Sequence, residues 1–168
     1  MNKLCSCIVP CFNEEKVIPI YYDEMQKVMK QEENIEFEII FVDDGSKDGT
    51  LEIMRKLSEQ DPKVHYISFS RNFGKEGAVF AGIAQAEGDC IAVMDCDLQH
   101  PPETLIKMYR LWEDGYQVIE GVKASRGRES FIHKMFAKTF YSIISDATGI
   151  DMSRASDFKL MDRQAAEE

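Results

Sequence analysis

Two aspartates separated by one residue, Asp95 and Asp97, directly follow an apolar run and could bind a metal. Carboxylates at positions i and i+2, where a strand gives way to a loop, can converge on one hard cation. Mg²⁺ and Mn²⁺ prefer oxygen ligands and keep positions open for substrate phosphate oxygens. Gln99 could add a neutral oxygen. The pattern alone leaves another interpretation open, because two nearby aspartates in a loop also cap a following helix.

Polar residues follow three other apolar runs in the same way. PCFNEE (residues 10–15) follows the first run, Asp43 and Asp44 follow the second, and RNFGK (71–75) follows the third. A carboxylate there could accept hydrogen bonds from a ribose or a base, although Asp-Gly is also a common turn dipeptide. The RNFGK segment could equally be a loop that leads into a helix and carries solvated charges. Ligands bind beyond the carboxyl ends of parallel strands, and clustered carboxylates are costly unless a cation joins them.

The elements that must position these residues alternate between short apolar runs and helical patterns. The runs predict strands over residues 4–9, 37–42, 64–69, 90–94, 117–122 and 157–161. Helices are predicted over about 17–29, 51–57 and 75–86, after Pro101-Pro102, and over 131–144, with Ser46 or Asp48 capping the second. This alternation predicts an α/β sandwich with a mainly parallel sheet.

Length and composition further limit what kind of protein this chain can be. The 168 residues suit one domain over 1–168, and 44% apolar content is ordinary for a globular protein. We find no membrane-spanning stretch and no signal peptide. The end soon after the last predicted strand is abrupt, which indicates a shortened piece of a longer protein. Five cysteines, an odd number without a CxxC pair, are predicted to be buried, reduced thiols.

The net charge of −10 argues against nucleic-acid binding, which depends on Lys and Arg contacts to phosphates. The charge is uneven, because residues 121–163 hold eight Lys or Arg against five Asp or Glu. A basic segment on an acidic protein indicates a local anionic ligand. A solvated helix face is the alternative.

Four motifs in order, IVPCFNEE, FVDDGSKDGT, RNFGKEGA and MDCDLQHPPE, resemble the signature of glycosyltransferase family 2. The resemblance covers nearly the whole chain and implies the GT-A fold, a Rossmann-like three-layer sandwich that forms a single catalytic domain. GVKASRGRES and ASDFKLMDR look most like the enzymes that glycosylate polyprenyl phosphate, the dolichyl-phosphate mannose synthase and bactoprenol glucosyltransferase group. The resemblance implies an inverting hexosyltransferase that uses a UDP- or GDP-hexose and Mg²⁺ or Mn²⁺.

The resemblance also implies a role for each matching position. The nucleoside site would be lined by Pro10, Phe12, Asn13 and Glu14, with Asp43 or Asp44 and Arg71 reading the base or ribose. Asp95 and Asp97, with Gln99, would hold the metal and the diphosphate. Lys123, Arg126 and Arg128 would face the acceptor phosphate, and Asp157 would lie near the reacting centre. Lys123 stands where relatives often have Arg. Its ammonium can attract a phosphate but cannot make the two parallel hydrogen bonds that a guanidinium makes.

The acceptor decides what Asp157 does. A sugar hydroxyl needs a general base, and Asp157 would then be that base. A phosphate monoester, with a second pKa of about 6, is already mostly dianionic, so Asp157 could instead orient a basic side chain or the sugar. The basic segment favours a polyprenyl phosphate at the cytoplasmic side of a membrane, although this piece is expected to be soluble. The apolar segment 131–144 would be a core helix or a membrane-surface helix.

Several alternatives stay open at this point. The chain could be a family 2 transferase with a sugar-hydroxyl acceptor, or a non-catalytic nucleotide-binding fragment. A nucleotidyltransferase would need a Gly-rich loop after the first strand, and a dehydrogenase would need GxGxxG; PCFNEEKV contains neither. The sugar and the oligomeric state are not predicted.

Overall fold

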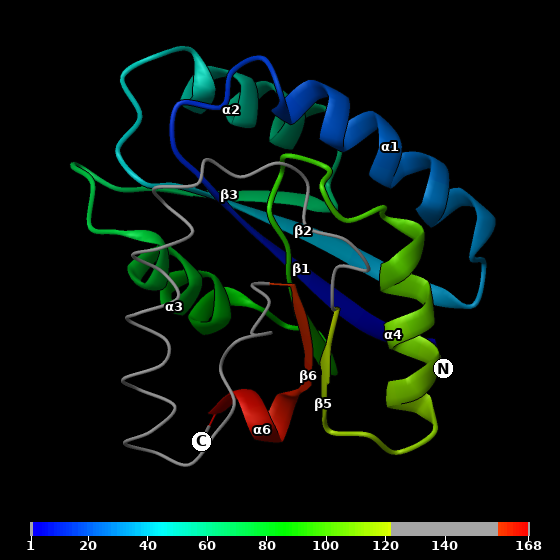
Figure 1. Cartoon of the computed structure of the whole chain (residues 1–168). Helices are drawn as coiled ribbons and strands as arrows, with labels where there is room; N and C mark the ends of the chain where they lie inside the picture. Colours follow the sequence, from blue (N-terminus) through cyan, green and yellow to red (C-terminus); the bar gives the residue numbers. More distant parts are fainter. Residues whose placement is uncertain (1, 122–157, 168) are drawn as a thin grey trace, which may run out of the picture.

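The computed structural model describes residues 2–121 and 158–167. In this part of the chain, six strands form one sheet in the order β3-β2-β1-β4-β6-β5 (Figure 1). The strands are β1 (Lys3–Cys11), β2 (Ile35–Asp43), β3 (Val64–Ser68), β4 (Cys90–Val93), β5 (Val118–Glu120) and β6 (Lys159–Asp162). β1 to β4 are mutually parallel, whereas β6 pairs antiparallel with both β4 and β5. The predicted α/β architecture with a mainly parallel sheet is confirmed.

Helices cover both faces of this sheet. One face packs against α1 (Ile18–Gln31), α2 (Thr50–Gln60) and α4 (Glu103–Glu113), and the other against α3 (Lys75–Gln85) and the short α6 (Arg163–Glu167). Figure 1 shows α1 and α2 above the sheet and α3 below it. The result is the expected three-layer sandwich. No helix within residues 2–121 and 158–167 has the length and apolar character needed to cross a bilayer.

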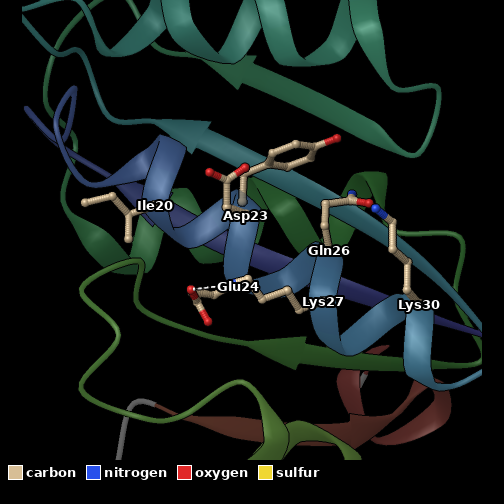
Figure 2. Close-up of a pocket in the computed structure, with 7 residues that line it drawn as sticks. Ile20, Asp23, Glu24, Gln26, Lys27 and Lys30 are labelled. Atoms are coloured by element: carbon tan, nitrogen blue, oxygen red, sulfur yellow. Dashed lines mark hydrogen bonds and ion pairs between the residues drawn. The ribbon is translucent and has the colours of Figure 1, made fainter.

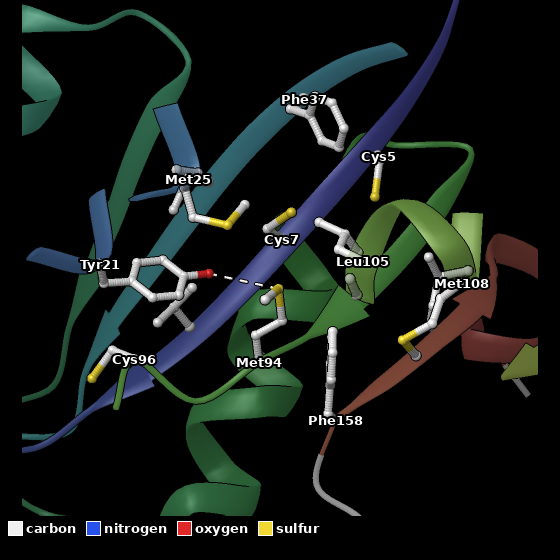
Figure 3. Close-up of a cluster of buried hydrophobic side chains, with 14 of the residues drawn as sticks. Cys5, Cys7, Tyr21, Met25, Phe37, Met94, Cys96, Leu105, Met108 and Phe158 are labelled. Atoms are coloured by element: carbon white, nitrogen blue, oxygen red, sulfur yellow. Dashed lines mark hydrogen bonds between the residues drawn. The ribbon is translucent and has the colours of Figure 1, made fainter. Parts of the chain in front are cut away.

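The apolar runs of β1, β2 and β4 are nearly continuous because these three strands are buried from both sides. In β1, Cys7 and Val9 belong to the cluster beneath α1, while Ile8 between them belongs to the cluster beneath α3. This alternation places successive side chains on opposite faces of the sheet. In the first cluster, the Tyr21 hydroxyl donates a hydrogen bond of 3.6 Å to the Met94 sulfur (Figure 3). All five cysteines are buried and free, as predicted.

The register brings the carboxyl ends of the parallel strands to one edge. Cys11 at the end of β1 pairs with Asp43 at the end of β2, which pairs in turn with Ser68 at the end of β3. β4 ends opposite Ile8 of β1. Loops from neighbouring strands therefore emerge together, which is the arrangement that the sequence predicted.

Some details differ from the sequence-based expectation. β1 continues to Cys11 rather than residue 9, because its last residues stay paired with the end of β2. Of the two caps predicted for α2, Ser46 was wrong and Asp48 is confirmed in part: the N-cap position is Gly49, without a side-chain cap bond, but the Asp48 carboxylate accepts from the N–H of the first helical residue. The Ser46 hydroxyl accepts from Asn13 N–H instead. The predicted helix over 131–144 lies outside the described residues.

Candidate functional site

The loop after β1 is fastened to the loop after β2 by hydrogen bonds between backbone and side chains. Asn13 N–H donates to the Ser46 hydroxyl at 2.8 Å, and the Asn13 side-chain oxygen accepts from Lys47 N–H at 2.9 Å. Glu14 N–H donates to the Thr50 hydroxyl at 2.8 Å. Asn13 adopts a left-handed backbone conformation with φ of 56°, which asparagine tolerates better than most residues. The two strand-end loops thus support each other.

Phe12 and Pro10 take different positions in this first loop. The Phe12 side chain is 44% exposed next to the fastened loop, so its ring is accessible to a ligand. Pro10 is the penultimate residue of β1 and pairs with Val42 of β2. Of these two predicted nucleoside residues, Phe12 therefore presents the larger open surface.

Asp43 and Asp44 are both buried, and both hold neighbouring loops. Asp43 accepts from Ser46 N–H at 2.9 Å and from the Ser68 hydroxyl at 3.0 Å. The two oxygens of Asp44 accept from Phe73 N–H at 2.7 Å and Gly74 N–H at 3.0 Å. Each oxygen keeps capacity for a further bond. Their predicted contact with a base or ribose would add to this structural role.

Arg71 lies where the loop after β2 crosses the loop after β3. Gly45 has a positive φ of 72°, and a Cβ there would overlap the backbone of Arg71. A side chain at position 45 would therefore force the two loops apart. The Arg71 guanidinium stacks over the Phe73 ring, with its carbon 4.7 Å from the ring centroid. This places an exposed cation on the loop whose backbone Asp44 holds.

The loop after β4 turns two carboxylates outward and one thiol inward. Asp95 is partly exposed and Asp97 is exposed, while Cys96 between them is only 3% exposed. An oxygen of Asp97 accepts from Gln99 N–H at 3.0 Å, and Leu98 adopts a φ of 57°. The pKa of the Cys11 thiol is raised, mainly by a hydrogen bond with Cys96 and secondly by burial. The Cys11 thiol therefore stays protonated, and it donates a hydrogen bond of 3.4 Å to the Val9 carbonyl oxygen.

Electrostatics link the loops after β1 and β4. Partial burial, and then the charges of Asp97, Asp48 and Asp95, raise the pKa of the Glu14 carboxyl above its ordinary value. Lys75 at the start of α3 offsets part of this negative charge, with its ammonium 2.6 Å from an oxygen of Asp95. Within the described ranges, no three His, Cys, Asp or Glu side chains are arranged to hold a metal by themselves. The edge is thus acidic and offers a pair of carboxylates rather than a complete cage.

The structure brings together most of the predicted nucleotide and metal residues. The first three motifs and the Asp95–Asp97 loop all emerge from the strand ends described above. Lys123, Arg126, Arg128 and Asp157 lie outside the described residues. Sequence reasoning missed the interlocking roles of Ser46 and Thr50 and the pairing of Lys75 with Asp95. The cationic RNFGK segment was the available signal for Lys75.

A separate surface hollow lies along α1 (Figure 2). All of its lining residues belong to that helix, among them Glu24 and Lys27, which pair with each other. None of the strand-end residues contributes to it. The hollow is therefore not part of the candidate site, which is built from loops of four strands.

The glycosyl transferase family 2 model matches residues 6–168 of the chain. The chain belongs to glycosyl transferase family 2. The four motifs that carried the resemblance all fall within the matched range. The family assignment made from those motifs is confirmed.

Curated relatives and solved structures agree with this family. The chain is 45% identical, over 97% of its length, to the uncharacterized glycosyltransferase YkcC of Bacillus subtilis, covering 50% of that protein. It is 37% identical, over 96% of its length, to the prophage bactoprenol glucosyl transferase homolog of Escherichia coli, covering 53% of it. The chain thus spans about half the length of these relatives.

A solved structure shows the fold independently. Glucosyl-3-phosphoglycerate synthase from Mycobacterium tuberculosis, in complex with Mn²⁺, UDP-glucose and phosphoglyceric acid, superposes with a TM-score of 0.69. The sequences are 20% identical, and the match covers 96% of this chain and 57% of the other. The fold is therefore that of the GT-A glycosyltransferases, as the motifs predicted.

Proposed function

We propose that this chain carries the donor-sugar site of an inverting glycosyltransferase that moves a hexose from a UDP- or GDP-hexose to a polyprenyl phosphate. The observation that carries the proposal is the edge where four parallel strands end. There Asp95 and Asp97 emerge beside Glu14 and the loop bearing Arg71. The family assignment supports the reaction class.

The chemistry of the carboxylate pair fits Mg²⁺ or Mn²⁺. Both ions take oxygen ligands, and Mg²⁺ is usually held by one or two carboxylates together with substrate phosphates. A pair of carboxylates without a complete protein cage matches that mode. A cation held by Asp95 and Asp97, with Gln99 as a neutral ligand, would neutralise charge that develops on the leaving diphosphate. The protein's own task is to hold these oxygens at the sheet edge.

The nucleoside would lie across the first two loops. The exposed Phe12 ring offers an apolar face to a base, and Asn13 and Glu14 lie next to it on the fastened loop. Asp43 or Asp44, which retain acceptor capacity, and Arg71 would contact the ribose or base. Pro10 would contribute from the end of β1. The rigid loop contacts support this assignment because they fix the site before a ligand arrives.

The acceptor half of the proposal draws on the relatives. One of them carries the name bactoprenol glucosyl transferase homolog. Lys123, Arg126 and Arg128 would attract the acceptor phosphate at the cytoplasmic face of a membrane. A phosphate dianion attacks without a general base, so Asp157 would orient the sugar or a basic side chain. Attack from the face opposite the leaving group would invert the anomeric centre.

Nucleotide binding gives the direct test of the donor site. We expect UDP or GDP, or the matching nucleotide sugar, to raise the melting temperature of this chain only with Mn²⁺ or Mg²⁺ present. Ligand at a hundred times its Kd adds about 2.7 kcal/mol, which for this size is roughly 5–10 °C. A thermal-shift panel with and without metal measures it. If no tested nucleotide stabilises the chain in a metal-dependent way, the donor-site proposal is wrong.

Sugar transfer to a short polyprenyl phosphate tests the acceptor. In a form of the protein that catalyses transfer, Arg126→Ala is expected to raise the KM for the polyprenyl phosphate about tenfold or more, because a charge-assisted contact is lost. The KM for the nucleotide sugar should stay unchanged. Arg55→Ala, on the exposed surface of α2, is the control. Equal acceptor KM values in Arg126→Ala and the parent protein would refute the phosphate contact.

A further inference from the structure

Lys75 forms an ion pair with Asp95, one of the two carboxylates proposed to hold the cation. Its ammonium lies 2.6 Å from an Asp95 oxygen, and the side chains are 37% and 35% exposed. Lys75 is the first residue of α3. The backbone just before it is held by Asp44, which accepts from Phe73 and Gly74 N–H. The structure thus directs this lysine from the helical layer that contains α3 toward a carboxylate in the loop after β4.

The Lys75 ammonium and a metal ion would compete for the negative charge of the Asp95 carboxylate. An ammonium on a flexible stem is a compact point charge that can satisfy a carboxylate without a metal. A divalent ion approaching Asp95 would meet both an occupied oxygen and a like charge within a few ångströms. Repulsion between like charges at this distance persists even at high dielectric. Lys75 should therefore weaken metal binding as long as it stays on Asp95.

A diphosphate changes this competition. Its oxygens offer Lys75 an alternative anionic partner and offer the metal additional ligands. We propose that Lys75 is an internal counter-cation, which holds Asp95 in the free protein and transfers to the donor diphosphate when the nucleotide binds. Release of Asp95 then couples metal binding to nucleotide binding. This inference rests on the proposed donor site and assigns Lys75 a positioning role within it.

Metal affinity in the absence of nucleotide is the measurement that isolates Lys75. Mn²⁺ binding to the whole chain can be followed by the electron paramagnetic resonance signal of free Mn²⁺. Lys75→Met is expected to bind Mn²⁺ about tenfold more tightly than the parent protein, because a competing positive charge is gone. Lys75→Arg keeps the charge and should stay within about twofold of the parent. Lys56→Met removes a lysine that pairs with Glu52 on α2 and should change nothing.

A second titration with UDP or GDP present completes the test. In the parent protein the nucleotide should tighten Mn²⁺ binding, and this enhancement should shrink several-fold in Lys75→Met. Reciprocity requires that Mn²⁺ enhance nucleotide binding less in the variant by the same factor. Lys75→Gln is a second neutral variant with a polar side chain, should Lys75→Met fold poorly.

The two possible failures are distinguishable. Unchanged nucleotide-free Mn²⁺ affinity in Lys75→Met and Lys75→Gln, in a protein that still binds nucleotide with Mn²⁺, overturns the role of Lys75 and leaves the donor site standing. A parent protein that binds neither Mn²⁺ nor any nucleotide overturns the donor site itself. Tighter Mn²⁺ binding in both neutral variants, with a smaller nucleotide enhancement, supports the inference.

Discussion

Asp97→Asn is expected to abolish the metal-dependent binding of nucleoside diphosphate and to lower kcat/KM by about a thousandfold, or about 4 kcal/mol. Asparagine keeps a side-chain oxygen that can accept from Gln99 N–H, as Asp97 does at 3.0 Å. The loop should therefore keep its turn while losing one negative charge. The predicted loss comes from the missing carboxylate ligand. Melting curves with UDP or GDP, with and without Mn²⁺, measure the binding effect.

Two further variants separate charge from loop structure. Asp97→Ala removes both the charge and the turn, so it should lose the metal dependence too and also lower the melting temperature slightly. Asp114→Asn, in the exposed position that ends α4, makes the same charge change elsewhere and should behave like the parent protein. If Asp97→Asn keeps its Mn²⁺-linked nucleotide binding, the ligand role belongs to another residue.

Asp44→Asn is expected to destabilise the fold by about 2–3 kcal/mol, because a buried carboxylate that accepts from two N–H groups becomes an amide. The amide nitrogen would face Phe73 or Gly74 N–H, donor against donor. The melting temperature should fall by roughly 4–12 °C for a chain of this size. The loop bearing Arg71 and Lys75 should also shift, so nucleotide affinity should fall. Urea denaturation and nucleotide titration measure the two effects.

Asp43→Asn provides the matched control for Asp44→Asn. Both aspartates are nearly fully buried, with exposures of 2% and 4%. One partner of Asp43 is the Ser68 hydroxyl, which can rotate to accept from an amide nitrogen, whereas a backbone N–H cannot. Asp43→Asn should therefore cost clearly less stability than Asp44→Asn. Equal losses in the two variants would show that charge, rather than the donor pattern, determines the effect.

The order of strands and helices follows from the sequence for simple physical reasons. Runs such as FEIIFV are nearly all apolar because parallel strands are covered on both faces. The carboxylates after each run predict a shared edge because parallel strands end on the same side. Four motifs in order then identify the family. These inferences depend only on local pattern and chain direction, so one sequence suffices.

Other features depend on which residues meet across long sequence separations. Glu38 sits inside the run that reads as apolar, yet it is buried and accepts from the Ser6 hydroxyl and from Glu87 N–H. The two partners of Asp44 are 29 and 30 residues away along the chain. Local pattern carries no information about such contacts, so the structural roles of Glu38 and Asp44 were not predictable.

For the Asp95–Asp97 pair, the sequence determined its residue types, its place after a buried strand and its family context. The tertiary structure decided its surroundings: Cys96 turned into the core, Asp97 bound to Gln99 N–H, and Lys75 of α3 paired with Asp95. The physical reason is that carboxylate chemistry belongs to the residue, whereas its charge balance depends on neighbours that only folding brings within a few ångströms.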